Sequence, residues 1–358
     1  MNRRLTIAGI TTTRADYGHL YWPFKSLIEN QYDLKIVVSG SHLSPQHGLS
    51  YKEIEKDGFP IAEKLDILSQ EDSILETTTA LSRATSEFAH CFQRLQPDLI
   101  LLLGDRYEVL GAAQAALIMG IPVAHLAGGD STEGAFDESI RHAITKMSHL
   151  HFVTNDVAAQ RVRQLGENPK HVYNIGSPGL DFILNSNLLT KKQLENELSI
   201  RFLENNLLVT FHSETLEEKT IAHFEQLLTA LDQMDNTGII FTRPNADPGG
   251  VEINRLIDAF VDSRTNVNVF TNLGSHKYLS VMAAVDAIVG NSSSGIYEAP
   301  TLKTATVNIG DRQKGRLAAS SVINCPPQTR AIKSAIEEAM SLDCTSVTNP
   351  YGDGMSSK

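Results

Sequence analysis

The sequence predicts an α/β protein built from two doubly wound domains. Three observations support this prediction: the length of 358 residues, short aliphatic and β-branched runs that recur along the chain, and amphipathic stretches long enough for one helix between runs. At roughly 100 to 200 residues per domain, this length indicates two domains. Strands buried on both faces of a parallel sheet form continuous apolar runs, so each domain is expected to contain a Rossmann-like sheet.

The first domain is expected over residues 1–175. Amphipathic stretches such as 17–29, 74–95 and 109–119 separate its apolar runs and are predicted to be helices. The predicted strands are 5–10, 34–39, 99–103, 122–125, 151–154 and 172–175.

The second domain is expected over residues 176–358. The boundary is placed at Gly176-Ser177-Pro178-Gly179, because turn-forming residues follow the last strand of the first half. Predicted strands are 207–211, 239–242, 267–270, 287–289 and 305–309, and helices are expected near 216–234, 251–261, 276–284 and 329–340.

Composition narrows the classes of function. A hydrophobic share of 41% with 20% charged residues is typical of a soluble globular protein, and the longest aliphatic run, 99–103, is too short to cross a bilayer. The net charge of -11 argues against a general affinity for nucleic acid. The three cysteines are widely spaced, which favours neither a disulfide framework nor a metal site, so we expect a cytoplasmic protein.

Two open α/β domains that face each other place the carboxyl ends of both sheets at a central cleft, where such folds bind ligands. The loops after strands are therefore the candidate functional segments. In the first loop, Arg14 and the backbone N–H groups at a helix N-terminus could bind a phosphate. The alternative is a polar connection in which Asp16 only caps the helix.

A serine-rich loop follows one strand of the second domain. Its hydroxyls and amides at the start of a helix suit a diphosphate, and Glu298, about one turn further on, could accept hydrogen bonds from ribose hydroxyls. The alternative is a serine-rich N-cap with a glutamate in the first turn. The loop residues are Asn291, Ser292, Ser293, Ser294 and Gly295.

Acidic side chains follow several strands of the first domain: Asp105, Asp130 and Asp137. Carboxylates that converge raise one another's pKa by like-charge repulsion, which turns a weak acid into a useful base near neutral pH. The alternative is separate helix caps and surface salt bridges. A spacing of four pairs neighbours along one helix surface: Asp137 with Arg141, and Glu138 with His142.

His212 ends the first strand of the second domain and is expected to face these acids across the cleft. A histidine there could act as a general acid or bind a phosphate, although a strand-end histidine is more often structural or solvated. Basic residues after strands of this half form a local basic region in an acidic protein: Arg243, Arg312, Lys314 and Arg316.

Five motifs in this order resemble the hydrolysing UDP-N-acetylglucosamine 2-epimerases of bacterial sialic-acid synthesis. The resemblance runs from Arg3 to about Tyr351. The motifs are Thr13-Arg14-Ala15-Asp16-Tyr17, Gly104-Asp105-Arg106-Tyr107-Glu108, Arg141-His142-Ala143-Ile144-Thr145-Lys146, Gly290-Asn291-Ser292-Ser293-Ser294-Gly295 and Asn308-Ile309-Gly310-Asp311-Arg312-Gln313-Lys314-Gly315-Arg316.

The resemblance implies a two-Rossmann (GT-B-like) architecture and an enzyme without a cofactor or metal. Its reaction would convert UDP-GlcNAc and water to UDP and N-acetylmannosamine, by elimination to 2-acetamidoglucal and hydration. A related branch acts on UDP-N,N'-diacetylbacillosamine in legionaminic-acid synthesis. A non-hydrolysing 2-epimerase and a UDP-sugar-binding module without catalysis are the further alternatives. A homo-oligomer, dimer or tetramer, is also implied.

The resemblance also implies roles for individual residues. The diphosphate would be bound by Ser293, Ser294 and Gly295, the ribose by Glu298 and a phosphate by Arg14. Acid and base chemistry would come from Asp105, Asp130 and Asp137, with His212 beside the leaving group. The remaining substrate contacts are expected at Arg243, Asn291, Ser292, Arg312 and Arg316.

One position departs from the family pattern. Where the family has Gly-Gly-Glu, this chain has Gly128-Gly129-Asp130, whose side chain is one methylene, or about 1.5 Å, shorter. Glu133 and Glu138 are nearby carboxylates that could substitute for Asp130 in catalysis.

Overall fold

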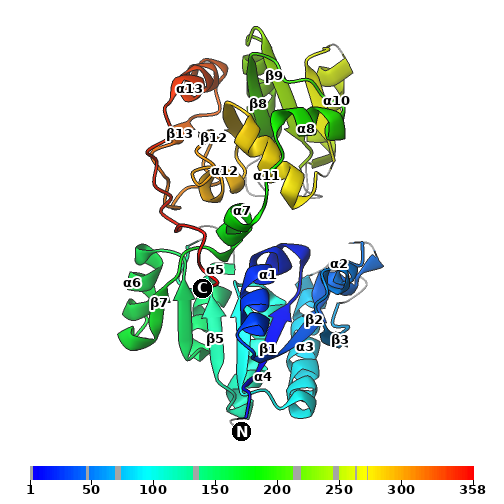
Figure 1. The fold of residues 1–358 in the computed structure, drawn as a ribbon, viewed down its shortest axis with the longest axis vertical. Coiled ribbons are helices and arrows are strands. Elements are labelled where there is room, and N and C mark those ends of the chain that lie inside the picture. The colour runs from blue at the N-terminus through cyan, green and yellow to red at the C-terminus, as the bar shows by residue number, and fades with distance from the viewer. Residues whose placement is uncertain are drawn as a thin grey trace. The chain divides into compact units, whose positions relative to one another are not determined.

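A computed structural model describes residues 3–45, 48–68, 74–131, 137–212, 219–244, 250–262, 264–271 and 273–358. The chain divides into two compact units, unit 1 (Met1–Phe182 and Tyr351–Lys358) and unit 2 (Ile183–Pro350). Each contains a parallel sheet with helices on its faces, which confirms the predicted fold class (Figure 1). The boundary expected from the sequence lies at residue 175, with the C-terminal segment in the second half, whereas the compact units divide after Phe182 and place residues 351–358 in unit 1.

The sheet of unit 1 has the order β3-β2-β1-β4-β5-β6-β7, and all neighbouring strands are parallel. The strand order reverses between β1 and β4, so the loops after these two strands flank a topological switch point. The strands are β1 (Thr6–Thr11), β2 (Asp33–Ser39), β3 (Ile61–Leu65), β4 (Leu99–Leu103), β5 (Val123–Leu126), β6 (Leu150–Val153) and β7 (Val172–Asn174).

Alternate strand residues of unit 1 enter two large apolar cores, one on each face of the sheet, and Val153 and Val172 enter a smaller cluster under α6. Phe88 and Phe92 belong to the core under α3, α4 and α5, whereas Tyr17 and Phe24 belong to the core under α1 and α2. The helices are α1 (Arg14–Glu29), α2 (Tyr51–Lys56), α3 (Ile74–Leu95), α4 (Tyr107–Met119), α5 (Asp137–Met147), α6 (Asp156–Gln164) and α7 (Asp181–Asn185), which spans the boundary with unit 2.

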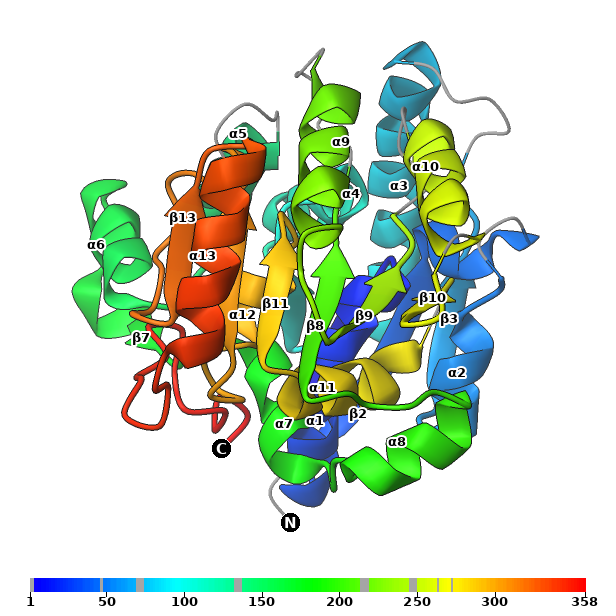
Figure 2. The ribbon, with the colours of Figure 1, turned by 90° about the horizontal axis from the view of Figure 1, so that it is seen from above.

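The sheet of unit 2 has the order β10-β9-β8-β11-β12-β13, again with parallel neighbours (Figure 2). One core cluster packs α9, α10 and α13 against the sheet. The strands are β8 (Asn205–Thr210), β9 (Thr237–Thr242), β10 (Val267–Phe270), β11 (Ala287–Gly290), β12 (Ala305–Ile309) and β13 (Val322–Cys325). The helices are α8 (Lys191–Leu198), α9 (Thr220–Leu231), α10 (Gly250–Asp262), α11 (Gly274–Ala284), α12 (Ser294–Tyr297) and α13 (Thr329–Ser341).

Every strand that the sequence predicted is present, but the edge strands β3 and β13 were missed. Their side chains are only partly buried, so neither segment has the continuous apolar run of a central strand. In the part of the chain that the structure describes, no helix is long and apolar enough to cross a membrane.

The C-terminal segment packs against the residues that precede the unit boundary. Tyr351 is 2% exposed, and its carbonyl oxygen accepts a hydrogen bond from the backbone N–H of Ser177 at 2.6 Å. The buried carboxylate of Asp181 accepts hydrogen bonds from the backbone N–H groups of Ser356 and Ser357, at 2.8 and 2.7 Å. One side chain therefore fixes the end of the chain to unit 1.

We predict that Asp181→Ala lowers the free energy of unfolding by about 2 kcal/mol, because it leaves two partly buried N–H groups without an acceptor. Thermal unfolding followed by circular dichroism should show a midpoint lower by about 4 °C. Asp353→Ala is the control, since the Asp353 carboxylate accepts an exposed hydrogen bond in the same segment. An equal loss in both variants would contradict the prediction.

Candidate active site

Asp105 lies in the loop after β4, at the switch point of unit 1. Gly104 has a φ of 76°, a left-handed conformation that glycine adopts without strain, so the chain can turn sharply after the strand. The carboxylate of Asp105 forms an ion pair with Arg141, whose side chain is almost completely buried. A charge pair at this depth orients the carboxylate more firmly than a surface pair would.

Arg141, on α5, joins two of the predicted acidic loops. One guanidinium nitrogen donates to the Asp105 carboxylate, and the other donates to the backbone carbonyl oxygen of Asp130 at 2.6 Å. The spacing of four residues predicts Arg141 on the same helix surface as Asp137, but Arg141 is not among the site residues predicted from sequence. The available signal was an arginine one turn after an acidic helix start, in a helix that is otherwise amphipathic.

Asp137 is the first residue of α5 and lies near Asp105. Burial raises the pKa of its carboxyl group, and the negative charge of Asp105 raises it further, while the guanidinium groups of Arg141 and Arg106 act in the opposite direction. The structure thus brings Asp105 and Asp137 together, two of the three carboxylates that were expected to converge. A carboxyl group with a raised pKa is a stronger base once it is ionised.

The carboxylate of Asp130 is bound at the end of β6. It accepts hydrogen bonds from the Thr154 hydroxyl, at 2.8 and 3.0 Å, and from the Asn155 amide at 3.1 Å. The guanidinium of Arg161 donates to the preceding carbonyl oxygen, that of Gly129. The side chain of Asp130, one methylene shorter than the family glutamate, is therefore bound by residues that follow β6 in the sheet of unit 1.

The second helical pair of the sequence analysis is present. The Nε2 atom of His142 lies 3.7 Å from a carboxylate oxygen of Glu138, and the other oxygen accepts a hydrogen bond from the Ser131 hydroxyl at 2.8 Å. Glu133, the other carboxylate that could replace the family glutamate, lies outside the described residues.

Asp16 caps α1, as the alternative interpretation of the first loop held. Its carboxylate accepts hydrogen bonds from the backbone N–H groups of Thr12 and Thr13, and the Thr13 hydroxyl accepts one from the Asp16 N–H. Arg14 lies at the first position of this helix and forms an ion pair with Glu53 at 3.2 Å. Both side chains are about half exposed, and such surface pairs are weak enough for a ligand phosphate to displace.

In unit 2, Asn291 joins its loop to the end of β8. Its side-chain oxygen accepts a hydrogen bond from the His212 N–H at 2.7 Å, and its amide donates to the His212 carbonyl at 2.9 Å. Asn291 is completely buried, so it fixes the backbone of His212 rather than presenting an amide at the surface. Its carbonyl oxygen accepts hydrogen bonds from Arg312, at 3.0 Å, and from Gln313, at 2.8 Å.

The serine-rich loop is part of a chain of hydroxyl groups. The Ser294 hydroxyl lies 3.0 Å from that of Ser292 and 2.7 Å from that of Tyr278, on α11. The Tyr278 hydroxyl in turn lies 3.5 Å from that of Thr210, at the end of β8. Tyr278 was missed by the sequence analysis, because nothing near it in the sequence marks a contact with this loop.

Ser293 is the N-cap residue of α12, a helix of four residues. Gly295 lies against β12, where an added Cβ atom would be 2.5 Å from a methyl carbon of Thr306. The glycine is thus required for packing, which brings the serine-rich loop close to the sheet.

Glu298 follows α12 and places a carboxylate oxygen in a buried position. Among the described residues, this Oε2 atom has no hydrogen-bond partner. Burial raises the pKa of the carboxyl group to about 7, although Arg316 opposes the shift. The Arg316 guanidinium lies 5.4 Å from the ring centre of Tyr297 and donates to Gln313 at 2.7 Å. A buried acceptor without a donor suits the hydroxyl group of a ligand.

Arg243, which follows β9, is bound by side chains of α10. It donates to Asn254 at 3.1 Å and forms an ion pair with Asp258 at 2.5 Å. The expected contact with the substrate would have to displace these partners. The loop residues 245–249 lie outside the described part of the chain.

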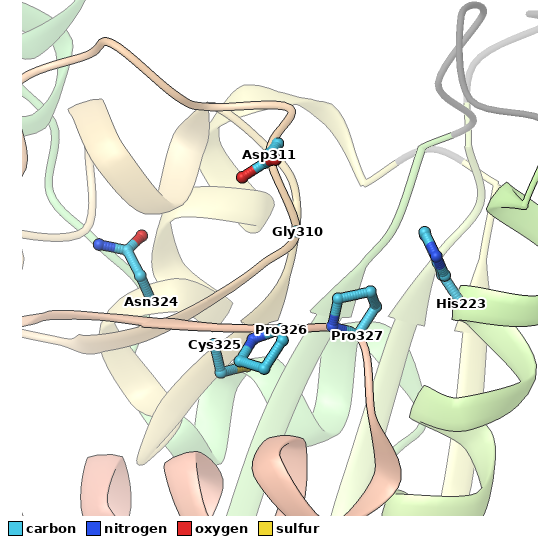
Figure 3. Close-up of a pocket in the computed structure, with 7 residues that line it drawn as sticks. All are labelled: His223, Gly310, Asp311, Asn324, Cys325, Pro326 and Pro327. Carbon is cyan, nitrogen blue, oxygen red and sulfur yellow. The ribbon is translucent and has the colours of Figure 1, made fainter.

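A pocket of about 400 Å³ lies beside the carboxyl ends of β12 and β13 in unit 2 (Figure 3). None of the predicted site residues lines it, and burial raises the pKa of the Cys325 thiol to about 11, so the thiol is neutral at pH 7. The lining residues are His223, Gly310, Asp311, Asn324, Cys325, Pro326 and Pro327.

All three cysteines are buried and free. Within the described ranges, no cluster of histidine, cysteine and acidic residues could hold a metal ion.

Sequence comparisons place the chain among epimerases. A family model described as UDP-N-acetylglucosamine 2-epimerase matches residues 25–358. A Campylobacter jejuni protein named GDP/UDP-N,N'-diacetylbacillosamine 2-epimerase (hydrolyzing) is 45% identical over 88% of this chain and 83% of its own length. A Legionella pneumophila UDP-N,N'-diacetylbacillosamine 2-epimerase (hydrolyzing) is 34% identical over 98% of this chain and 92% of its own. The Escherichia coli polysialic acid biosynthesis protein P7 is 36% identical over 96% of this chain and 89% of its own.

Solved structures share the fold at low sequence identity. A Listeria monocytogenes protein described as a UDP-N-acetylglucosamine 2-epimerase superposes with a TM-score of 0.82 at 15% identity, over 99% of this chain and 94% of its own. The UDP-GlcNAc 2-epimerase from Neisseria meningitidis, solved with UDP-GlcNAc, gives a TM-score of 0.77 at 18% identity, over 99% of this chain and 97% of its own. At these identities the likeness supports the fold alone.

We predict that Glu298 makes stability depend on pH. Its raised pKa means that the folded protein binds the proton more tightly than the unfolded chain, so this stabilisation is fully present at low pH and is lost as the pH rises through about 7. Relative to Glu298→Gln, the wild type should lose about 2 to 3 kcal/mol between pH 5 and pH 8. Denaturant unfolding at both pH values measures this difference, with the exposed Glu337→Gln as control. A constant difference between wild type and Glu298→Gln would refute the prediction.

Proposed function

Because this chain belongs to the UDP-N-acetylglucosamine 2-epimerase family, we propose that it is a hydrolysing 2-epimerase, which inverts C2 of a UDP-linked 2-acetamido sugar and releases UDP. The observation that supports this proposal most directly is the group formed by Asp105, Asp137 and Arg141. It combines a buried cation, an oriented carboxylate and a second carboxyl group whose pKa is raised. Proton transfer at a weakly acidic carbon requires such a base.

We propose UDP-N,N'-diacetylbacillosamine as the preferred substrate, ahead of UDP-GlcNAc. The support comes from two relatives, 45% and 34% identical, whose names specify diacetylbacillosamine and hydrolysis. This was the alternative substrate of the sequence analysis, and N-acetylmannosamine formation for sialic-acid synthesis becomes the second choice. The expected cytoplasmic location and the dimeric or tetrameric state stay predictions from the family resemblance.

Unit 2 is proposed to bind the nucleotide. The unpartnered Oε2 atom of Glu298 would accept a hydrogen bond from a ribose hydroxyl. The Ser293 and Ser294 hydroxyls and the nearby backbone N–H groups would bind the diphosphate. Arg312 and Arg316 supply positive charge in the neighbouring loop, and Arg14 of unit 1 would exchange its ion pair with Glu53 for a phosphate. Arg243 would likewise bind the substrate in place of its present ion-pair partner, Asp258.

Unit 1 is proposed to supply the acid and base. A carboxylate, Asp105 or Asp137, removes the proton from C2, the C1–O bond breaks with its electron pair going to UDP, and a C1=C2 double bond forms. Water then adds its oxygen to C1, and C2 accepts a proton on the opposite face. Asp130 completes the acidic group, and its hydrogen bonds to Thr154 and Asn155 favour orientation of the loop over direct proton transfer.

His212 is assigned to the leaving group. Its backbone N–H and carbonyl are both hydrogen-bonded to the side chain of Asn291, the first residue of the serine-rich loop, which supports a role for His212 next to the proposed diphosphate residues of unit 2. A histidine at that place can donate a hydrogen bond or a proton to the departing UDP. Negative charge develops on the diphosphate as the C1–O bond breaks, and donors placed in advance stabilise it.

The assay that tests this function is proton NMR of the purified protein with each UDP-sugar in D2O. We expect UDP-N,N'-diacetylbacillosamine to give UDP and a free sugar inverted at C2 that carries deuterium there, and UDP-GlcNAc to react at least about 10-fold more slowly. A UDP-linked epimer as the product would identify a non-hydrolysing enzyme. Binding of both UDP-sugars without turnover would identify a binding module.

We predict that Asp105→Asn reduces kcat at least about 1000-fold, because the amide cannot accept the C2 proton or pair with Arg141. The affinity for UDP, measured by calorimetry, should stay within about twofold of the wild type. Asp98→Asn is the matched control, since Asp98 lies at the other end of β4 and its carboxylate accepts a hydrogen bond from the Thr6 N–H. Retained turnover in Asp105→Asn would remove Asp105 from the mechanism.

A further inference from the structure

We propose that His125, a buried histidine on β5, is a positioning residue that fixes the orientation of Asp105. This inference rests on the proposed function, because it concerns the same group of carboxylates. His125 is 0% exposed, was not a candidate from the sequence, and occupies the strand beside the one that leads to Asp105.

The first contact of His125 is with the residue before Asp105. Its Nε2 atom lies 2.7 Å from the carbonyl oxygen of Gly104. A carbonyl oxygen only accepts hydrogen bonds, so Nε2 carries the proton and donates. Gly104 is in the left-handed conformation, with a φ of 76°, and its amide donates to the carbonyl oxygen of Leu126. The backbone N–H and the carbonyl oxygen of Gly104 are thus both hydrogen-bonded to residues of β5.

The second contact of His125 is with α5. Its Nδ1 atom lies 3.3 Å from the hydroxyl oxygen of Thr145. That hydroxyl has one proton, which it shares between the carbonyl oxygen of Arg141, at 3.0 Å, and the more distant Nδ1 atom. Burial lowers the pKa of the His125 ring to about 4, so the ring is neutral at pH 7 and its Nδ1 atom can only accept. One ring thus joins the loop of Asp105 to the helix turn that supplies its arginine partner.

The third contact explains the first glycine of the Gly-Gly-Asp segment. A Cβ atom on Gly128 would lie 2.9 Å from Nδ1 of His125 and 3.0 Å from the Thr145 hydroxyl. Only glycine leaves space for the ring, and the loop that leads to Asp130 packs directly on it. The loop of Asp105 and the loop of Asp130 therefore contact the His125 ring directly. The helix α5, which begins at Asp137, contacts the ring through Thr145.

The consequence is a rigid placement of Asp105 relative to Asp137. Without the Nε2 donor, the peptide between Gly104 and Asp105 loses its hydrogen bond to β5, and the backbone of Asp105 can shift with it. A displacement of about 1 Å in a reacting group can cost about 100-fold in rate. The negative charge of Asp105 also raises the pKa of Asp137, against Arg141 and Arg106, so movement of Asp105 would lower that pKa.

The test compares two side chains of nearly equal shape. His125→Gln keeps an N–H donor near the position of Nε2, whereas His125→Met has the same length and no donor. We expect kcat to fall about 10- to 100-fold in His125→Met with KM within about twofold, and to fall less than about fivefold in His125→Gln. The acid limb of the kcat profile, set by the carboxylate base, should move to lower pH in the methionine variant only.

The matched control is His151→Met. His151 lies opposite His125 in the register of β5 and β6, is 1% exposed and contacts Glu167 at 3.2 Å. It is an equally buried histidine of the same sheet, and its kcat should stay within about twofold of wild type. Equal losses in His125→Gln and His125→Met, or the same loss in His151→Met, would show a general packing effect and overturn the proposal.

A second measurement separates this proposal from the proposed function. Carbon-13 NMR of protein labelled at aspartate carboxyl groups follows the titration of Asp137 without any substrate. We expect the pKa of Asp137 to fall in His125→Met and to stay unchanged in His151→Met; an unchanged pKa in both would overturn the proposal even in an active enzyme. If His125→Met does not fold, Thr145→Val replaces it, with the same expected direction for kcat and for the Asp137 pKa.

Discussion

The ion pair between Arg141 and Asp105 is the interaction on which the arrangement of unit 1 depends. The guanidinium is nearly fully buried, and it also donates to the carbonyl oxygen of Asp130. A cation at this depth is stable only when charged and polar partners surround it. The loops after β4 and β5 and the first turns of α5 must therefore fold together, because each supplies or receives one of these contacts.

In unit 2, the serine-rich loop is joined to its neighbours mainly by hydrogen bonds between neutral groups. The buried amide of Asn291 binds the backbone of His212, and hydroxyl groups link the serine-rich loop to α11 and β8. Within this network the Oε2 atom of Glu298 is the exception, a buried acceptor with no partner among the described residues. Satisfied groups make the loop rigid, and an unsatisfied one leaves a place for a ligand donor.

The fold was predictable because its signal is local. Continuous apolar runs mark the central strands of both sheets, and only β3 and β13, whose side chains are partly exposed, escaped this pattern. The candidate residues were found for a related reason, since the loops after parallel strands share one edge of a sheet. The roles of Asp16 and Asn291 were less accessible, because a polar residue in a loop suits a cap, a structural contact or a ligand equally well from sequence alone.

The sequence by itself determined the two α/β units, the family resemblance and the set of loops that contain the candidate residues, because hydrophobic periodicity and motif spacing are properties of neighbouring residues. The tertiary structure decided which partner each polar side chain takes. Arg141 reaches Asp105 across 36 positions, Asn291 reaches His212 across 79, and His125 reaches Gly104 across 21. Such contacts depend on strand order and helix packing, and no local pattern specifies them.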